Sequence, residues 1–344
     1  MAPFLEFRNV TKIFGGGLMR KKRTVAVDNI SFSIEVDEPA IHAVAGESGS
    51  GKSTLGLILM GFVKPTSGQV LYRGQDITRL SSAQQRNFRQ EIQAVFQDPF
   101  SVYNPFYKVD HVLNVPIAKF KLADSSAAAK ALIEEALTGV GLRPEETLGR
   151  YPHELSGGQR QRIMVARALL TRPKLIIADE PVSMVDASLR ATILESLSKL
   201  NRDFGISIIY ITHDLTTAYH VGDDILVLYQ GSLSEAGNVE LVIKQPQHPY
   251  TQLLVNSIPW ADLNRRWNEM PIQAREAALH GNLVQGCKFA DRCPQVMARC
   301  RTSAPQLYQT APRRATACFL HDDAAPLPNQ DVTQLFVTRS VQNQ

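Results

Sequence analysis

Two glycine-rich turns in this 344-residue sequence have the residue types of phosphate-binding sites. The first, GESGSGKST, follows the pattern G-x-x-x-x-G-K-[ST] with Gly46, Gly51, Lys52 and Ser53. In such a loop successive backbone N–H groups converge on phosphates, the lysine reaches the outer phosphates, and the serine hydroxyl reaches Mg²⁺. A strand-like segment precedes the turn and a helix-like segment follows it, so the sequence predicts nucleotide binding.

The second turn, ELSGGQRQR (154–162), places a serine and two glycines before a helix-forming run. The first backbone N–H groups of a helix have no partner within the helix and attract anions. One chain cannot easily bring two separated helix starts onto one phosphate. The second turn therefore raises the question of whose phosphate it would hold.

Polar side chains that suit hydrolysis follow three apolar, strand-like segments. Asp179, at the end of LIIAD, can hold the hydration shell of Mg²⁺, and Glu180 is a candidate base for an attacking water. His213 follows IIYIT, and Gln97 follows EIQAVF with an amide oxygen that can ligate Mg²⁺ or water. Ligands of open α/β sheets bind outside the carboxyl ends of the strands, which favours one catalytic site. A histidine at a strand end can equally be a structural residue.

The four cysteines are Cys287, Cys293, Cys300 and Cys318, all late in the chain. Cytosolic chains rarely keep disulfides, so this clustering favours a metal site. Zinc modules usually show tight C-x2-C pairs, and the spacing C-x5-C-x6-C-x17-C has none. Four thiolates on looser loops suit a [4Fe–4S] cluster with a structural role. Zinc and free thiols remain the alternatives.

The elements that must position these residues alternate between strand-like and helix-like segments, which predicts an α/β fold with a largely parallel sheet. The stretch of about 98–160 is rich in Ala, Lys and Glu and predicts a mainly helical insert. We expect an ATPase domain over residues 1–238, a C-terminal region over 239–320 with the cysteines, and a flexible tail over 321–344.

Composition and charge exclude several classes of protein. Hydrophobic residues make up 44% and charged residues 20% of the chain, as in soluble globular proteins. The formal net charge of +4 is small for this length and does not suggest a nucleic-acid partner. The first residues lack the apolar stretch of a signal peptide, and no apolar run reaches the ~18–20 residues that span a bilayer. We therefore expect a cytoplasmic protein whose membrane role, if any, comes through partners.

With LSGGQ beside the phosphate loop, the sequence from Phe4 to about Gly237 resembles the ATP-binding cassette (ABC) ATPases. Every diagnostic motif stands in family order, including the D-loop Ser183–Asp186, in which Met184-Val185 replaces the commoner Ala-Leu. The resemblance implies an ABC-type P-loop ATPase core that binds ATP with Mg²⁺. The residues it implicates at the nucleotide are Phe14, Gly46, Glu47, Ser48, Gly49, Ser50, Gly51, Lys52, Ser53, Thr54, Ser156, Gly157, Gly158, Gln159 and Asp186.

The resemblance also answers the question about the second turn. In this family two cassettes pack head to tail, and the signature of one closes on the γ-phosphate held by the other. Ser156, Gly157, Gly158 and Gln159 would therefore bind the ATP of a partner subunit. Phe14 would stack on adenine, Ser53, Gln97 and Asp179 would hold Mg²⁺, and Glu180 with His213 would act in hydrolysis.

The C-terminal stretches QHPYTQLLVNSIP (247–259) and GCKFADRCPQVMARC (286–300) resemble ATPases of oligopeptide and dipeptide importers. That group also serves some oligosaccharide and nickel importers and can carry a [4Fe–4S] cluster. The implied partners are a second, distinct ABC ATPase subunit, two transmembrane permease subunits and an extracytoplasmic solute-binding protein. The implied location is the cytoplasmic face of the inner membrane. Arg and Lys residues beside the cysteines would oppose the charge of the thiolates.

The main alternative is a soluble ABC ATPase in DNA repair or translation. Repair members separate their halves with long coiled coils, and translation factors carry two cassettes, whereas this sequence has a short insert and one phosphate loop. A non-hydrolysing scaffold is disfavoured by Glu180. The aromatic stretch DPFSVYNPFYKV (98–109) is a candidate groove for a membrane subunit, or else part of the core of the helical insert.

Overall fold

The computed structural model describes residues 2–15, 23–98, 103–183, 185–258 and 285–336. It divides into two units: the first contains residues 1–34, 42–76 and 212–344, and the second contains residues 35–41 and 77–211. The units interleave along the chain, so their boundaries differ from the expected division at residues 238 and 320.

The first unit contains an antiparallel sheet in the order β2-β1-β4-β5. Its strands are β1 (Leu5–Gly15), β2 (Arg23–Ile34), β4 (Ser67–Tyr72) and β5 (Gln75–Asp76). Apolar side chains of β1 and β2 face one side and are buried, and the Phe7 and Phe32 rings stack with centroids 4.9 Å apart. The expected hairpin after the phosphate-loop helix is present as β4 and β5.

The same unit contains strands in the order β11-β12-β10-β9-β3. They are β3 (Ile41–Ala45), β9 (Asp224–Tyr229), β10 (Ser232–Asn238), β11 (Tyr308–Ala311) and β12 (Arg314–Thr316). Every residue of β3 and β9 is buried, and the two strands run parallel. The helices of this unit are α1 (Lys52–Leu59), α8 (Leu215–Val221), α9 (Val239–Lys244), α10 (Pro249–Asn256) and α11 (Ala298–Thr302).

The C-terminal region packs on the strands that carry the phosphate loop. Strand β12 pairs antiparallel with β10, so residues after 238 extend the sheet of the first unit. Residues 321–336, expected to begin a flexible tail, instead bury Leu327, Val332 and Leu335. The Thr333 hydroxyl also accepts a 2.8 Å hydrogen bond from the Ser33 N–H of β2. Apolar residues spaced along this short segment therefore anchor it, and residues 337–344 lie outside the described part of the chain.

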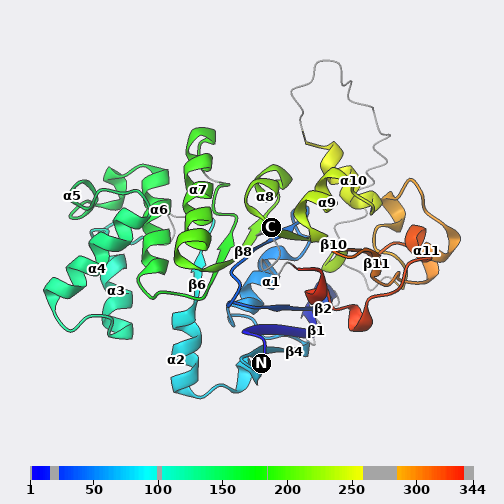
Figure 1. Ribbon diagram of the computed structural model, residues 1–344, viewed down its shortest axis with the longest axis horizontal. Coiled ribbons are helices and arrows are strands. Elements are labelled where there is room, and N and C mark those ends of the chain that lie inside the picture. The colour runs from blue at the N-terminus through cyan, green and yellow to red at the C-terminus, as the bar shows by residue number, and fades with distance from the viewer. Residues whose placement is uncertain (1, 16–22, 99–102, 184, 259–284, 337–344) are drawn as a thin grey trace, which may run out of the picture. The chain divides into compact units, whose positions relative to one another are not determined.

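The second unit contains three parallel strands in the order β8-β7-β6. They are β6 (Ile92–Val95), β7 (Leu175–Asp179) and β8 (Ser207–Thr212). The helices are α2 (Ser82–Glu91), α3 (Asp110–Phe120), α4 (Ser126–Gly139), α5 (Pro144–Thr147), α6 (Gly157–Leu169) and α7 (Ala187–Phe204). Helices α3, α4 and α6 contact one another (Figure 1) and bury apolar residues such as Leu113, Leu137 and Ile163.

The predicted mainly helical insert corresponds to α3, α4 and α5, and the described residues between β6 and α6 contain no strand. The predicted α/β fold class is therefore confirmed. None of the helices in the described ranges is both long enough and apolar enough to cross a bilayer.

Candidate functional site

Glycines fix the path of the phosphate loop between β3 and α1. Gly46 has a φ of +151°, and a Cβ there would lie 2.3 Å from the Leu228 carbonyl oxygen of β9. Gly51 has a φ of +102°, and a Cβ there would lie 2.1 Å from the Ala26 carbonyl oxygen of β2. A side chain at either position would displace backbone, which is why the two motif glycines are required.

The interior of the loop combines a buried cation with an unsatisfied hydroxyl. Lys52 is buried, and its Nζ donates to the carbonyls of Gly46 at 2.8 Å and Glu47 at 2.9 Å. The Ser50 Oγ is buried and has no hydrogen-bond partner in the described part of the chain. A Cβ at Gly49 would meet no atom within 4 Å, so the loop is open at that position. These features suit an anion at the start of α1.

Residues Ser53 and Thr54 lie in the first turn of α1, and Ser53 is exposed. Phe14 lies near the end of β1, with 43% of the residue exposed and the Lys12 Nζ 5.0 Å from its ring centroid. An exposed aromatic face of this kind can stack on a flat ring system.

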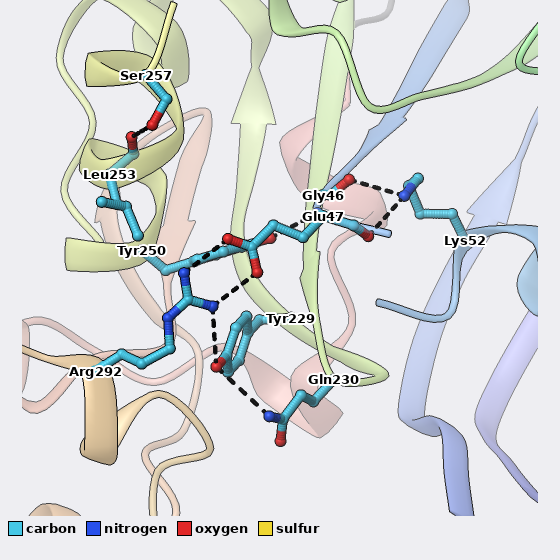
Figure 2. A network of polar contacts seen from close by, with 9 residues as sticks. All are labelled: Gly46, Glu47, Lys52, Tyr229, Gln230, Tyr250, Leu253, Ser257 and Arg292. Atoms are coloured by element: carbon cyan, nitrogen blue, oxygen red, sulfur yellow. Dashed lines mark hydrogen bonds and ion pairs between the residues drawn. The ribbon is translucent and has the colours of Figure 1, made fainter. Parts of the chain in front are cut away.

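The second residue of the loop, Glu47, is held by the C-terminal region (Figure 2). Its N–H donates to the Tyr250 hydroxyl of α10 at 2.8 Å. Its carboxylate accepts two hydrogen bonds from Arg292, at 2.7 and 2.8 Å. Burial raises the pKa of the Tyr250 hydroxyl, which therefore stays neutral. The rings of Tyr229, Tyr250 and Phe289 pack together beside this ion pair.

In the second unit, Asp179 ends β7 and Glu180 follows it with a φ of +46°. The Glu180 N–H donates to the Ile211 carbonyl at 2.9 Å. The Glu180 carbonyl accepts from the N–H and the hydroxyl of Ser183, at 3.2 and 3.0 Å. The bend after the strand is therefore held on both sides, and this fixes where the Glu180 side chain starts.

Helix α6 begins at the LSGGQ sequence. Ser156 is its N-cap: its Oγ accepts from the Gln159 N–H at 3.2 Å, while the Gln159 side chain accepts from the Ser156 N–H at 2.9 Å. This capping box uses both side chains to order the turn. A Cβ at Gly157 would meet no atom within 4 Å, whereas one at Gly158 would lie 2.8 Å from the Leu189 side chain of α7.

Three other predicted site residues lie at the ends of elements. Gln97 is half-buried two residues after β6, and Asp186 is the N-cap residue of α7. His213 is exposed and directly follows β8. The first unit thus holds Phe14, the phosphate loop and His213, and the second holds Gln97, the signature turn, Asp179, Glu180 and Asp186.

The cysteines, distant in sequence, come together in the first unit. Cys287, Cys293, Cys300 and Cys318 line one small pocket with His248. Burial raises the pKa of the Cys318 thiol to about 11, and the other three cysteines add to that rise. Yet across the described ranges no group of three or more His, Cys, Asp or Glu side chains is arranged to hold a metal ion. The structure gathers the predicted cysteines, but their arrangement does not fit a completed metal site.

The basic residues near the cysteines, which the sequence predicts to oppose the charge of the thiolates, have carboxylate partners in the structure. Each forms an ion pair with a carboxylate: Lys288 with Asp28, Arg292 with Glu47, Arg299 with Asp322 and Arg301 with Asp291. A guanidinium binds a carboxylate in a two-bond fork, a geometry that thiols do not offer. Sequence reasoning missed the roles of Tyr250 and Arg292. Both residues lie in the C-terminal stretches that resemble importer ATPases, but the residues around them do not indicate a contact with Glu47.

The sequence matches two known protein families. Residues 27–183 match the ABC transporter family, and residues 234–300 match the C-terminal region of oligopeptide/dipeptide transporters. The dimeric structure of the ATP-binding cassette MJ0796 in a post-hydrolysis state, bound to ADP and Pi, has a TM-score of 0.59 and 29% identity, covering 68% of this chain and 98% of that chain. The cbiO1 protein of Clostridium perfringens is part of the ABC transporter complex cbiONQ. Its structure has a TM-score of 0.60 and 26% identity, and the match covers 71% of this chain and 92% of that chain.

Relatives at the sequence level cover nearly the whole chain. A putative oligopeptide transport ATP-binding protein of Bacillus subtilis, YkfD, is 39% identical over 94% of this chain and 97% of its own length. The oligopeptide transport ATP-binding protein AppF of the same organism is 39% identical over 92% of this chain and 97% of its own length. A probable peptide ABC transporter ATP-binding protein of Sinorhizobium fredii, y4tS, is 40% identical over 87% of this chain and 84% of its own length.

The fold and the phosphate loop define an ATP hydrolase of the ABC transporter class, for which ATP and Mg²⁺ are expected. Within that class the chain belongs to the oligopeptide/dipeptide importer family of ATP-binding subunits. It is the ATP-hydrolysing subunit of an ABC importer, and the comparisons favour this function over the DNA-repair or translation alternative.

Proposed function

We propose that this chain hydrolyses ATP to drive the import of peptides or related solutes such as oligosaccharides. The observation that carries the proposal is the phosphate loop, where buried Lys52 and the unsatisfied Ser50 hydroxyl lie at the start of α1. The peptide class is supported by the match of residues 234–300 and by the names of the relatives. The solute itself would be selected by the membrane and binding-protein partners.

Several of the predicted site residues would contribute to binding ATP and Mg²⁺. Phe14 would stack on adenine, and Lys52 would leave the carbonyls of Gly46 and Glu47 to reach the outer phosphates. Ser53, Gln97 and Asp179 would hold Mg²⁺, all through oxygen atoms, which this ion prefers. When bound, Mg²⁺ would neutralise charge on the phosphates.

Hydrolysis would require two cassettes packed head to tail. Glu180 would accept the proton of the attacking water, and His213 would assist it. The open Gly157 and the ordered turn at Ser156 would meet the γ-phosphate of ATP held by the partner, with Asp186 contributing across the same interface. This arrangement makes hydrolysis depend on closure of the dimer. The second cassette would be a distinct homologue.

The experiment that tests this function compares Glu180→Gln with Lys52→Ala in the importer complex. Glu180→Gln should retain ATP binding and reduce turnover by about 10²–10⁴-fold, because only the general base is lost. Lys52→Ala should weaken binding itself, because its charge faces the phosphates before reaction. Nucleotide titration and phosphate release measure the two effects. Near-normal turnover in Glu180→Gln would contradict the assignment of the base.

A groove on the second unit is a candidate docking site for a membrane subunit. It has a volume of about 440 Å³ and includes Tyr103, Tyr107, Val115, Pro116 and Phe120 in its lining. Large apolar side chains open to solvent often mark sites of interaction. Most of its lining residues belong to the predicted helical insert, which joins Gln97 to the signature turn, and Gln93 of β6 and Arg167 of α6 complete it. An amphipathic cytoplasmic helix of a permease subunit would fit such a surface.

Phe106, next to this groove in sequence, is 86% exposed and offers the cleanest test. Phe106→Asp should leave the fold intact but weaken assembly with the membrane subunits and reduce transport. Phe62→Asp is the matched control, since Phe62 is 64% exposed but lies in the other unit. Copurification in detergent measures the effect, and equal assembly of both variants would count against the groove. Phe100, also expected to contribute, lies outside the described residues.

We also propose that the four cysteines hold a [4Fe–4S] cluster, with zinc as the alternative. The support is the donor set, since four thiols from separate segments of the C-terminal region, including Cys300 of α11, line one pocket. Their side chains would have to rearrange to coordinate a metal, because the described residues form no group that could hold a metal ion. The full assembly would comprise this ATPase, its homologue, two permease subunits and an extracytoplasmic binding protein. It would lie at the cytoplasmic face of the inner membrane.

A further inference from the structure

Glu47 is held at each of its polar groups by another part of the first unit (Figure 2). The Tyr250 hydroxyl accepts from its N–H at 2.8 Å, and its carbonyl accepts from the Lys52 Nζ at 2.9 Å. Its carboxylate accepts from both terminal nitrogens of Arg292. Two of these three partners belong to the C-terminal region, not to the phosphate loop. The position of the loop's second residue therefore depends on that region.

Arg292 is itself held in place by the cysteine turn. It ends a short 3₁₀ helix, η4 (Ala290–Arg292), directly before Cys293. The turn is closed by hydrogen bonds from the Ala290 N–H to the Cys287 carbonyl at 3.0 Å and from the Cys287 N–H to the Cys300 carbonyl at 2.7 Å. Movement of these cysteines would therefore move the guanidinium.

Two aromatic rings lie close to the guanidinium of Arg292. Its centre lies 5.7 Å from the Tyr229 ring centroid and 5.6 Å from that of Phe289, close enough for cation–π attraction. The side chains of Arg292 and Glu47 are 25% and 38% exposed. A partly exposed ion pair with a single bond would contribute little. A two-bond fork with flanking rings fixes direction as well as distance, so it can position the loop.

A second contact joins the same two regions. The Lys288 Nζ lies 2.8 Å from the Asp28 carboxylate and donates to the Gln230 carbonyl at 2.8 Å. The next residue, Gly231, donates its N–H to the Ser50 carbonyl in the phosphate loop. The cysteine region thus touches both the loop and the turn behind it.

We propose that Arg292 is a positioning residue for ATP binding, which holds the phosphate loop through the Glu47 carboxylate. The affinity for ATP then depends on the folded state of the cysteine region. This inference rests on the proposed function, because it concerns the same nucleotide site. It adds a role for a region that lies 245 residues away from Glu47 in sequence.

The test measures the Kd of a fluorescent ATP analogue with the full 344-residue chain. Arg292→Met should raise the Kd by about 3- to 20-fold, which lies within the range of coupling energies between residues in contact. Arg292→Lys should recover part of the loss, because it restores one bond of the fork. Arg301→Met is the matched control, since Arg301 pairs with exposed Asp291 in the same region. Its Kd should equal that of the parent.

Glu47→Ala separates positioning from general damage to the cysteine region, because it removes the same ion pair from the loop side. If Arg292 acts through Glu47, a variant with both Arg292→Met and Glu47→Ala should have a Kd for the ATP analogue no higher than the higher Kd of the two single variants. Turnover at saturating ATP in the importer complex should change less than the Kd in Arg292→Met.

An unchanged Kd in Arg292→Met, or effects that multiply in the double variant, would overturn the inference. If proteolysis shows that Arg292→Met unfolds the cysteine region, the Kd of Glu47→Ala for the ATP analogue becomes the test. A raised Kd in Glu47→Ala supports the inference, and an unchanged Kd refutes it. Failure of the proposed function looks different. In that case the parent chain itself does not bind the analogue, and Lys52→Ala makes no difference.

Discussion

The backbone at Glu180 shows how a single residue can be prepared for chemistry. A left-handed φ of +46° is uncommon outside glycine and costs about 1–3 kcal/mol. Hydrogen bonds to Ile211 and Ser183 hold the backbone there. Strain that the surroundings enforce often marks functional positions, and here it falls on the proposed general base.

At the residue scale, Glu235 makes the stability of the folded protein depend on pH. It is fully buried in β10 and accepts hydrogen bonds from the N–H groups of Gln247 and His248, just before α10. Burial raises its pKa from 4.5 to about 7, although these bonds oppose the rise. The unfolded chain therefore ionises this carboxyl at lower pH than the folded chain. The stability it contributes is complete below pH 4.5 and is lost as pH rises towards 7.

Glu235→Gln should remove this dependence, because the amide stays neutral and keeps one acceptor oxygen. Between pH 4 and pH 8 (roughly the window over which the shift acts), the parent should lose on the order of 3 kcal/mol relative to the variant. Urea unfolding followed by circular dichroism measures the difference. Glu240→Gln, which removes an exposed carboxylate of the same unit, is the matched control. Parallel pH profiles for parent and Glu235→Gln would contradict the prediction.

At the scale of elements, two helices of the second unit begin with the same capping box. Ser156 and Gln159 start α6, and Ser81 and Gln84 start α2. Only the α6 start is followed by glycines, and Gly157 is open on its side-chain side. The shared chemistry makes α2 a control for α6.

Ser156→Ala and Ser81→Ala should each cost about 1 kcal/mol of stability, the usual effect of losing an N-cap. Only Ser156→Ala should also slow ATP turnover in the assembled importer, because the α6 turn is proposed to face the ATP of the partner. Thermal unfolding and phosphate release measure the two effects. Equal ATP turnover in the two variants would show that Ser156 only caps helix α6 and would contradict its proposed role at the partner's ATP.

At the scale of the whole molecule, the proposed cluster would link the stability of the C-terminal region to metal binding. Anaerobically purified protein should contain iron and absorb broadly near ~400 nm, as iron–sulfur charge transfer does. Cys293→Ser should lose this absorbance and expose residues after 285 to protease, because a bound cluster stabilises only the folded form. Stoichiometric zinc without iron would replace the cluster with a tetrahedral site. Neither metal would leave the cysteines as packing residues of the pocket.

The sequence by itself determined the chemistry that short patterns encode. Gly46, Gly51 and Lys52 predict a phosphate loop because the backbone geometry such a loop needs excludes side chains at the glycines. Alternating strand-like and helix-like segments likewise predicted the α/β class, because periodicity is local. The order of the motifs was enough to indicate the family.

Only the tertiary structure decided which distant residues meet. The Arg292 fork on Glu47, the burial of Glu235 and the packing of residues 321–336 on β2 all join segments far apart in sequence. The sequence predicts that Arg292 opposes the negative charge of the cysteine site and that Leu335 lies in a flexible tail, and it does not indicate the contacts that either residue makes. Charge and hydrophobicity show that a side chain needs a partner, but the path of the chain determines which partner it finds.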